Sequence, residues 1–217
     1  MPRESRDERA RRAARIAQVL AKTYPDVRTA LRFANPFELL IATILSAQCT
    51  DKKVNEVTAV LFRRFGTPAK LAAADPAAVE EIIRPTGFYR QKAKSIQSAS
   101  RDLVESFGGE VPRTLEELVK LRGVARKTAS VVLGNAFGIP AIAVDTHMLR
   151  VNRRLGLTAH EEPDLVERDL AEILPPREWI AWTNRIIHHG RVCCVARAPR
   201  CPECPLLPLC PEGVRRT

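Results

Sequence analysis

The chain starts several of its helices with a recurring pair of residues, a polar capping residue followed by proline. Asn35-Pro36, Thr67-Pro68 and Asp75-Pro76 have this pattern, and Pro163 marks a further start. The polar side chain accepts a hydrogen bond from the first turn, and proline suits the first helical position because no backbone donor is needed there. No segment shows convincing strand alternation. The sequence therefore predicts an all-α fold with short connections.

Apolar spacing between these signals predicts where the longer helices lie. An alanine-rich, charged helix is expected over residues 6–24, and an almost wholly apolar core helix over residues 37–47. Further helices are expected from Thr50 or Asp51, over 92–107, over 115–121, from about Lys127 to Phe137, behind Asp145, from Pro163, and around Trp179 to Ile187.

The composition limits the classes of function. The 217 residues allow one large domain or two small ones, and the net charge is +10. A chain this basic is most simply a nucleic-acid binder, with acidic surfaces or membrane headgroups as alternatives. Aromatic residues make up only 5%, which argues against folds that stack single-stranded bases. The arginine-rich start, Met1 to Arg15, is no secretory signal, and no apolar run is long enough to span a membrane.

A glycine-containing turn joins two of the expected helices. Leu115 to Leu121 leads into Gly123, and Lys127 opens the apolar run that follows. Backbone N–H groups at a helix start favour an anion, and the helix dipole also disfavours the charged form of a lysine there. The plain alternative is a solvated lysine at a helix end.

Four cysteines near the C-terminus are the candidate metal ligands: Cys194, Cys201, Cys204 and Cys210. Six, two and five residues separate them, on a proline-rich loop. Zinc is the first alternative, but structural zinc sites usually use two paired arms, and only Cys201 and Cys204 form a pair. A 4Fe-4S cluster needs four thiolates without that pairing. In a reducing compartment disulfides are not expected. We expect only one of the adjacent Cys193 and Cys194 to face the metal, and Cys49 to be a buried small residue.

The glycine-containing turn with its two flanking helices (the hairpin) and the C-terminal loop with the four cysteines (the tail) together resemble the endonuclease III family of DNA glycosylases, over nearly the whole chain. The tail spacing carries most of this resemblance, with Gly87-Phe88-Tyr89 and Val144-Asp145-Thr146-His147 in support. The resemblance implies two helical domains with a DNA-binding cleft between them. A six-helix barrel would span residues 29–139, with a helix–hairpin–helix motif at about 115–137. A domain holding a 4Fe-4S cluster would combine residues 1–28 and 140–217.

The same resemblance implies that Lys127 is the catalytic nucleophile and Asp145 its carboxylate partner. A neutral amine can attack the sugar carbon that carries a damaged base and form a Schiff base, after which β-elimination breaks the strand. Burial, Arg126 and the helix dipole should lower the pKa of Lys127 toward roughly 7–8. Asp145 would stabilise positive charge on the sugar. Its alternative role is a helix N-cap.

Residues expected to contact DNA follow from the same likeness. Gln48 and Phe88 match positions that fill the hole left by a flipped nucleotide, and His147 lines the site. The family more often has leucine where Phe88 stands. The alternatives are a polar residue at a helix end for Gln48 and a core aromatic for Phe88.

The hairpin departs from the family pattern. Where Leu-Pro-Gly-Val-Gly is usual, this chain has Leu121-Arg122-Gly123-Val124-Ala125. Arg122, Gly123, Ala125 and Arg126 are the expected phosphate contacts, and the Cβ of Ala125 is expected to crowd the phosphate or to resist a positive φ.

The expected function is a bifunctional glycosylase and AP lyase that removes oxidised pyrimidines from double-stranded DNA. Its expected partner is duplex DNA with damaged bases or abasic sites. A monomer without membrane contact, in the cytoplasm at the nucleoid, is expected. Two alternatives remain: a catalytically weak, cluster-bearing DNA-binding protein, and a glycosylase of this family for pyrimidine dimers or other lesions. Lys127 argues against the adenine-excising branch, which lacks that lysine.

Overall fold

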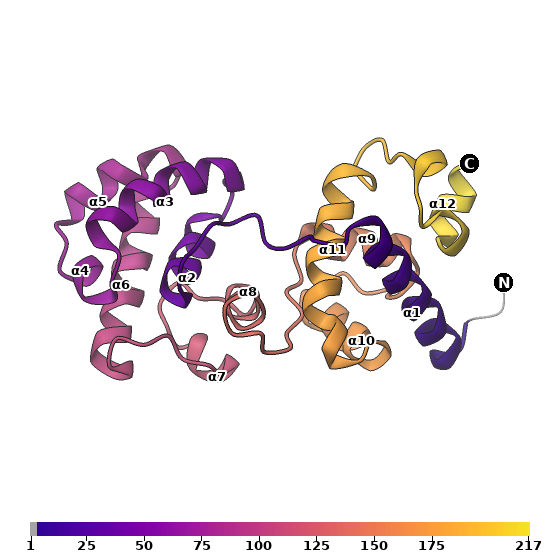
Figure 1. Cartoon of the computed structure of the whole chain (residues 1–217), viewed down its shortest axis with the longest axis horizontal. Helices are drawn as coiled ribbons and strands as arrows, with labels where there is room; N and C mark the ends of the chain where they lie inside the picture. Colours follow the sequence, from indigo (N-terminus) through magenta and orange to yellow (C-terminus); the bar gives the residue numbers. More distant parts are fainter. Residues whose placement is uncertain (1–3) are drawn as a thin grey trace. The chain divides into compact units, whose positions relative to one another are not determined.

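The computed structural model describes residues 4–217, so the first three residues of the predicted arginine-rich start lie outside it. Over the described residues the secondary structure is helical, which confirms the predicted all-α class (Figure 1). The chain divides into two compact units, Thr29–Ile139 and a second unit formed by Met1–Arg28 with Pro140–Thr217. None of the helices within residues 4–217 is long and apolar enough to cross a membrane.

The unit Thr29–Ile139 is built around its longest helix, α6 (Tyr89–Phe107). Helices α2, α4 and α5 pack against α6, and α8 packs against α2 (Figure 1). The other elements of this unit are α2 (Pro36–Leu45), α3 (Asp51–Phe65), α4 (Pro68–Ala72), α5 (Pro76–Ile83), the 3-10 turn η1 (Arg84–Thr86), α7 (Leu115–Leu118) and α8 (Arg126–Phe137).

The predicted caps start these helices. Asn35 Oδ1 accepts a hydrogen bond from the Glu38 N–H at 3.0 Å, and the side chains of Thr67 and Asp75 cap α4 and α5. Helix α2 is buried along most of its length, because its apolar residues face neighbours on every side. An all-round apolar helix belongs at the centre of a core, as its sequence predicted.

The second unit joins the two ends of the chain. Helix α1 (Arg6–Thr23) packs against α10 (Pro163–Ile173) and α11 (Trp179–Val192), and α11 packs against α9 (Thr146–Arg154) (Figure 1). Trp182 is the largest fully buried side chain here and lies in one apolar cluster with residues of α1, α9 and α10. The remaining elements are η2 (Pro176–Glu178), η3 (Cys201–Glu203), η4 (Leu207–Leu209) and α12 (Pro211–Arg216).

Several boundaries differ from the sequence prediction. Helix α6 begins at Tyr89 rather than at Lys92, and α7 ends at Leu118 rather than at Leu121. The tail that was predicted as a loop contains two 3-10 turns and the short helix α12. Prolines at the first or second position of these elements explain the error, because they fit helix starts as well as loops.

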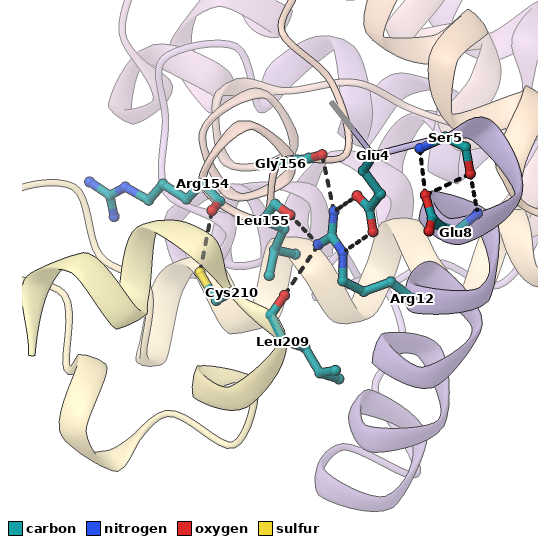
Figure 2. Close-up of polar contacts among 9 residues, drawn as sticks. All are labelled: Glu4, Ser5, Glu8, Arg12, Arg154, Leu155, Gly156, Leu209 and Cys210. Atoms are coloured by element: carbon teal, nitrogen blue, oxygen red, sulfur yellow. Dashed lines mark hydrogen bonds and ion pairs between the residues drawn. The ribbon is translucent and has the colours of Figure 1, made fainter. Parts of the chain in front are cut away.

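Arg12 ties the N-terminal helix to distant parts of its unit (Figure 2). Its guanidinium donates to the carbonyl oxygens of Leu155, Gly156 and Leu209, and forms an ion pair with Glu4 at 2.6 Å. The carbonyls of Leu155 and Gly156 follow α9, and that of Leu209 precedes Cys210. A planar group with five donors can satisfy three such acceptors together. Arg12 therefore holds the end of α9 and the cysteine tail against α1.

Candidate functional site

The turn between α7 and α8 is held against α6 by two contacts. Gly123 has φ +83°, and a Cβ at this position would lie 2.8 Å from the Cβ of Ser95 on α6. The backbone N–H of Arg122 donates to the Asp102 carboxylate, also on α6, at 3.0 Å. Only glycine satisfies both the left-handed backbone and the close approach. The hairpin is thus fixed in place by the central helix of its unit.

Ala125 corrects one expectation drawn from the sequence. Its φ is −83° and its ψ is 165°, an ordinary extended conformation at the N-cap of α8. A methyl side chain causes no backbone strain there, so the predicted resistance to a positive φ was wrong. Gly123 instead supplies the left-handed residue. Ala125 also has no side-chain acceptor to cap α8, which leaves the helix start without the protein cap that serine or threonine would provide.

Lys127 lies in the first turn of α8, directly behind this turn. It is partly buried, whereas Arg122 and Arg126 are exposed. The hairpin therefore presents a lysine from a rigid backbone, with arginine side chains extending from its surface.

Two non-glycine residues of the same unit have left-handed backbones. Gln48 has φ 52° and Phe88 has φ 48°. The Phe88 side chain is 69% exposed, which excludes the core aromatic considered from the sequence. Left-handed bulky residues are strained, and such strain gathers at ligand-contacting positions. A large exposed ring on a strained backbone at the start of α6 is thus a candidate contact with a partner.

Lys92 supports the turn that carries Phe88, a role that the sequence did not suggest. The side chain is 6% exposed, and its Nζ donates to the Thr86 carbonyl oxygen at 2.7 Å. Burial lowers the pKa of Lys92, with the Cys49 thiol acting in the opposite direction. Cys49 itself is half-buried, not fully buried as expected. A buried lysine one turn into a helix has no distinct sequence signal, because most lysines at such positions are solvated.

In the other unit, Asp145 is the N-cap of α9. Its Oδ1 accepts a hydrogen bond from the Met148 N–H at 2.8 Å, and the side chain is partly buried. His147 is also half-buried, and its Nδ1 lies 3.1 Å from the Arg150 guanidinium. Burial lowers the pKa of His147, while the Asp145 carboxylate acts in the opposite direction. The capping role considered from the sequence is present, and it holds the carboxylate in one orientation.

The four candidate ligands line one cavity in this unit: Cys194, Cys201, Cys204 and Cys210. Cys193 lines it too, and which of the two adjacent thiols would face a metal stays a prediction. Cys193 ends α11 with a φ of −124° and a ψ of −60°, outside helical geometry. That turn of the backbone brings both neighbouring thiols to the cavity.

The surroundings of these thiols combine burial with hydrogen-bond donors directed at sulfur. Burial raises the pKa of Cys204 to about 12 and also raises those of Cys193 and Cys210. Two donors point at sulfurs: the Gly213 N–H lies 3.2 Å from Cys210 Sγ, and the Arg154 guanidinium lies 3.3 Å from Cys194 Sγ. Buried thiols with donors directed at them match the needs of metal thiolates, because a metal cation offsets the cost of burying their charge.

His189 and Tyr24 complete the surroundings of the cavity. The His189 Nε2 lies 3.6 Å from Cys204 Sγ, and its Nδ1 lies 3.1 Å from the Tyr24 hydroxyl. Burial lowers the pKa of His189 to about 4 and raises that of Tyr24 to about 12. His189 lies only four and five residues before Cys193 and Cys194 in the sequence, whereas Tyr24 and Arg154 lie far from the cysteines. No local sequence pattern therefore connects Tyr24 or Arg154 with the cavity.

Comparisons with known proteins agree with this geometry. Residues 41–176 match the family described as HhH-GPD superfamily base excision DNA repair protein. An endonuclease III from Synechocystis sp. is 51% identical over 93% of this chain and 92% of its own length. That of Bacillus subtilis is 48% identical over 89% of both chains.

The chain belongs to the endonuclease III family. Among solved structures, a non-covalent endonuclease III–DNA complex aligns with a TM-score of 0.91 and 47% identity, over 95% of this chain and 97% of that chain. A trapped covalent endonuclease III–DNA intermediate gives 0.90 and 48%, over 95% and 98%. A thermostable thymine-DNA glycosylase, at 21% identity and a TM-score of 0.83 over 94% and 98%, shares the fold.

We predict that Gly123→Ala destabilises the protein more than Gly138→Ala does. Both glycines have left-handed backbones, but a Cβ at Gly138 would meet nothing within 4 Å. The free energy of unfolding should fall by about 2–4 kcal/mol for Gly123→Ala and by about 1–2 kcal/mol for Gly138→Ala, because only the first adds a steric clash. Denaturant unfolding of both variants measures the difference. Equal losses would show that the contact with Ser95 does not constrain the hairpin.

Proposed function

We propose that this chain excises oxidised pyrimidines from double-stranded DNA through a lysine Schiff base and then cleaves the strand by β-elimination. The enzyme class, a bifunctional base-excision DNA glycosylase and AP lyase, is that of the endonuclease III family. The observation that carries the proposal is the position of Lys127 in the first turn of α8, behind a hairpin anchored on α6.

Lys127 is the proposed nucleophile. Its neutral Nζ attacks C1′ of the damaged nucleotide, a nitrogen–carbon bond forms, and the glycosidic bond breaks with its electron pair leaving on the base, which takes up a proton. Opening of the sugar ring converts the adduct to a Schiff base. Loss of a C2′ proton then expels the 3′ phosphate, and hydrolysis of the Schiff base returns the free lysine. The balance requires only water and proton transfers.

Asp145 is the proposed carboxylate partner. A carboxylate stabilises the positive charge that develops on the sugar as the base departs, and it can accept a proton during ring opening. Its hydrogen bond to the Met148 N–H restricts its rotation before substrate binds, which reduces the reorganisation needed during reaction. The cap and the catalytic role are therefore compatible, because the second carboxylate oxygen can serve the substrate.

Gln48 and Phe88 are proposed to enter the duplex where the nucleotide leaves it. A flipped nucleotide costs stacking and pairing, which an inserted side chain partly restores. Both residues hold left-handed backbones in the same unit as Lys127, and the Phe88 ring is already exposed. Its flat face can stack on a neighbouring base, whereas leucine would only fill the gap. Gln48 offers an amide to the orphaned partner base.

The hairpin is proposed to bind backbone phosphates near the flipped nucleotide. Its backbone is rigid, the start of α8 lacks a side-chain cap, and Arg122 and Arg126 extend from it. These features suit an anion at a helix N-terminus. Because Ala125 is unstrained, backbone strain at this residue gives no reason to prefer a catalytically weak protein. His147 is proposed to line the same substrate site as Asp145. We further propose that the protein works as a monomer on nucleoid DNA.

The cysteine cavity is proposed to hold a 4Fe-4S cluster on Cys194, Cys201, Cys204 and Cys210. When bound, the cluster supplies a rigid centre for the tail and takes no part in bond cleavage, since glycosidic hydrolysis moves no electrons. Arg154 and the Gly213 N–H direct donors at two of the proposed ligand sulfurs, as expected around cluster thiolates. Arg154 also donates to the carbonyl oxygens of Val195 and Ala196, which positions the loop that follows Cys194.

Borohydride trapping tests the nucleophile. The wild-type protein should form a covalent adduct with a thymine-glycol or abasic duplex in borohydride, and Lys127→Gln should lose it, because only an amine forms a reducible Schiff base. Lys120→Gln is the matched control, since Lys120 is an exposed lysine of the same hairpin. An adduct that persists in Lys127→Gln, or a wild type that forms none, would contradict the proposal.

The Asp145→Asn variant, assayed alongside, separates the two roles of Asp145. Asparagine keeps a capping oxygen, so stability should change little, whereas the loss of charge should slow base release by roughly 100-fold or more. Undiminished base release in this variant would assign Asp145 to capping alone.

Replacement of Phe88 tests the wedge. Phe88→Ala should lower the rate of base release from duplex DNA by about 10-fold or more, because the gap is no longer filled, and Phe88→Leu should keep most of the activity. Neither should alter stability, because the ring is exposed. Val104→Ala removes an exposed apolar group from the other end of α6 as a control. Equal losses on single-stranded and duplex substrates would refute insertion.

Metal analysis tests the cluster. Protein from iron-replete cells should contain about four irons per chain and absorb at about 410 nm, and Cys201→Ala should lose both the iron and this absorbance. Cys49→Ala, which removes a thiol from the other unit, should retain them. A colourless protein with zinc from the same cells would be inconsistent with this assignment.

A further inference from the structure

Cys193 is the cavity thiol that the four-cysteine site leaves unused. It is 8% exposed and directly precedes Cys194. Its Sγ lies 3.9 Å from the Arg200 carbonyl oxygen, inside the loop that carries the other cysteines. Its burial therefore places a fifth thiol beside the four proposed cluster ligands.

A second set of ligand atoms converges around this thiol. One ring nitrogen of His189, Cys193 Sγ and Cys204 Sγ all lie within 4.8 Å of one another, and Nε2 is the nitrogen that lies 3.6 Å from Cys204 Sγ. Around tetrahedral zinc, with bonds of about 2.0–2.3 Å, neighbouring ligand atoms are roughly 3.3–3.8 Å apart. The three atoms therefore need to approach by only about 1 Å to share one ion. Thiolate and imidazole ligands at this spacing favour zinc over harder cations.

The orientation of His189 supports the same set. The ring is 1% exposed, and the Tyr24 hydroxyl holds its Nδ1 at 3.1 Å while its Nε2 faces Cys204 Sγ. Metal-binding histidines usually have their second nitrogen held by such an outer partner. A phenol hydroxyl donates or accepts. It can therefore support the tautomer that offers an Nε2 lone pair to a metal, and also the one that donates Nε2–H to a sulfur.

We propose that His189, Cys193 and Cys204 bind a single Zn²⁺, completed by one further ligand, as an alternative to the cluster on the four-cysteine set. Cys204 belongs to both sets, so the two metal states exclude each other. Each of the two adjacent cysteines is a ligand in only one of these states: Cys194 binds the cluster, and Cys193 binds zinc. The loop then keeps a folded, metal-bound form when iron is scarce.

The test compares metal content in full-length protein from iron-replete cells and from iron-depleted, zinc-supplemented cells. Wild type should hold one zinc per chain in the second case. X-ray absorption of that zinc should show both sulfur and imidazole-nitrogen neighbours. Cys193→Ala should weaken zinc binding by more than about 100-fold, since loss of an outer partner alone costs about 10–100-fold, yet keep the absorbance near about 410 nm. Cys194→Ala should do the reverse.

Tyr24→Phe serves as a graded variant, with zinc affinity expected to fall by about 10-fold through loss of the outer partner. A zinc shell of four sulfurs without nitrogen in the wild type would overturn the proposal, as would unchanged zinc affinity in Cys193→Ala. The wild-type measurement stands even if Cys194→Ala fails to fold. Because these readouts do not involve DNA, they stay independent of the Lys127 trapping result.

Discussion

The contact between Gly123 and Ser95 is the constraint on which the geometry around Lys127 depends. A backbone that touches another helix at Cβ distance cannot shift without breaking the packing. Helix α6, which supplies Ser95, also follows directly on its N-cap residue Phe88 and holds the Arg122 N–H through Asp102. One helix therefore fixes the positions of both the exposed Phe88 ring and the hairpin. The proposed nucleophile Lys127 is then carried by a rigid element, which is where reactive groups are best supported.

In this unit a strained residue, Phe88, is supported by a buried side chain, Lys92. Phe88 adopts a left-handed backbone that costs free energy. Lys92, buried one turn later, donates to the Thr86 carbonyl and so holds the turn from its other side. A charged group under burial is itself costly, so two unfavourable features keep each other in place. Such an arrangement is expected where a surface residue must meet a partner in a fixed pose.

Much of the fold could be predicted from the sequence, because its signals are local. Capping residues and prolines act within one turn, and they correctly marked the starts of α2, α4, α5 and α10. The predicted start of α6 was wrong because the left-handed backbone of Phe88, directly before the helix, has no signature in the spacing of apolar residues. The strain expected at Ala125 was wrong because the left-handed residue is Gly123, two positions earlier. The surroundings of the cysteine cavity could not be predicted where Tyr24 and Arg154 contribute to them, since no sequence pattern encodes such distant partners.

One unit combines the N-terminal and C-terminal segments, so it can form only after the continuous unit has been synthesised. Residues Thr29–Ile139 are continuous and can fold as soon as they leave the ribosome, since domains generally fold as units. Arg12 must instead wait for the carbonyls of Leu155 and Leu209, which are synthesised after the whole of that unit. The cysteine cavity is thus assembled after the other unit. A chain cut before Cys194 would contain the lysine-bearing unit but none of the four candidate metal ligands.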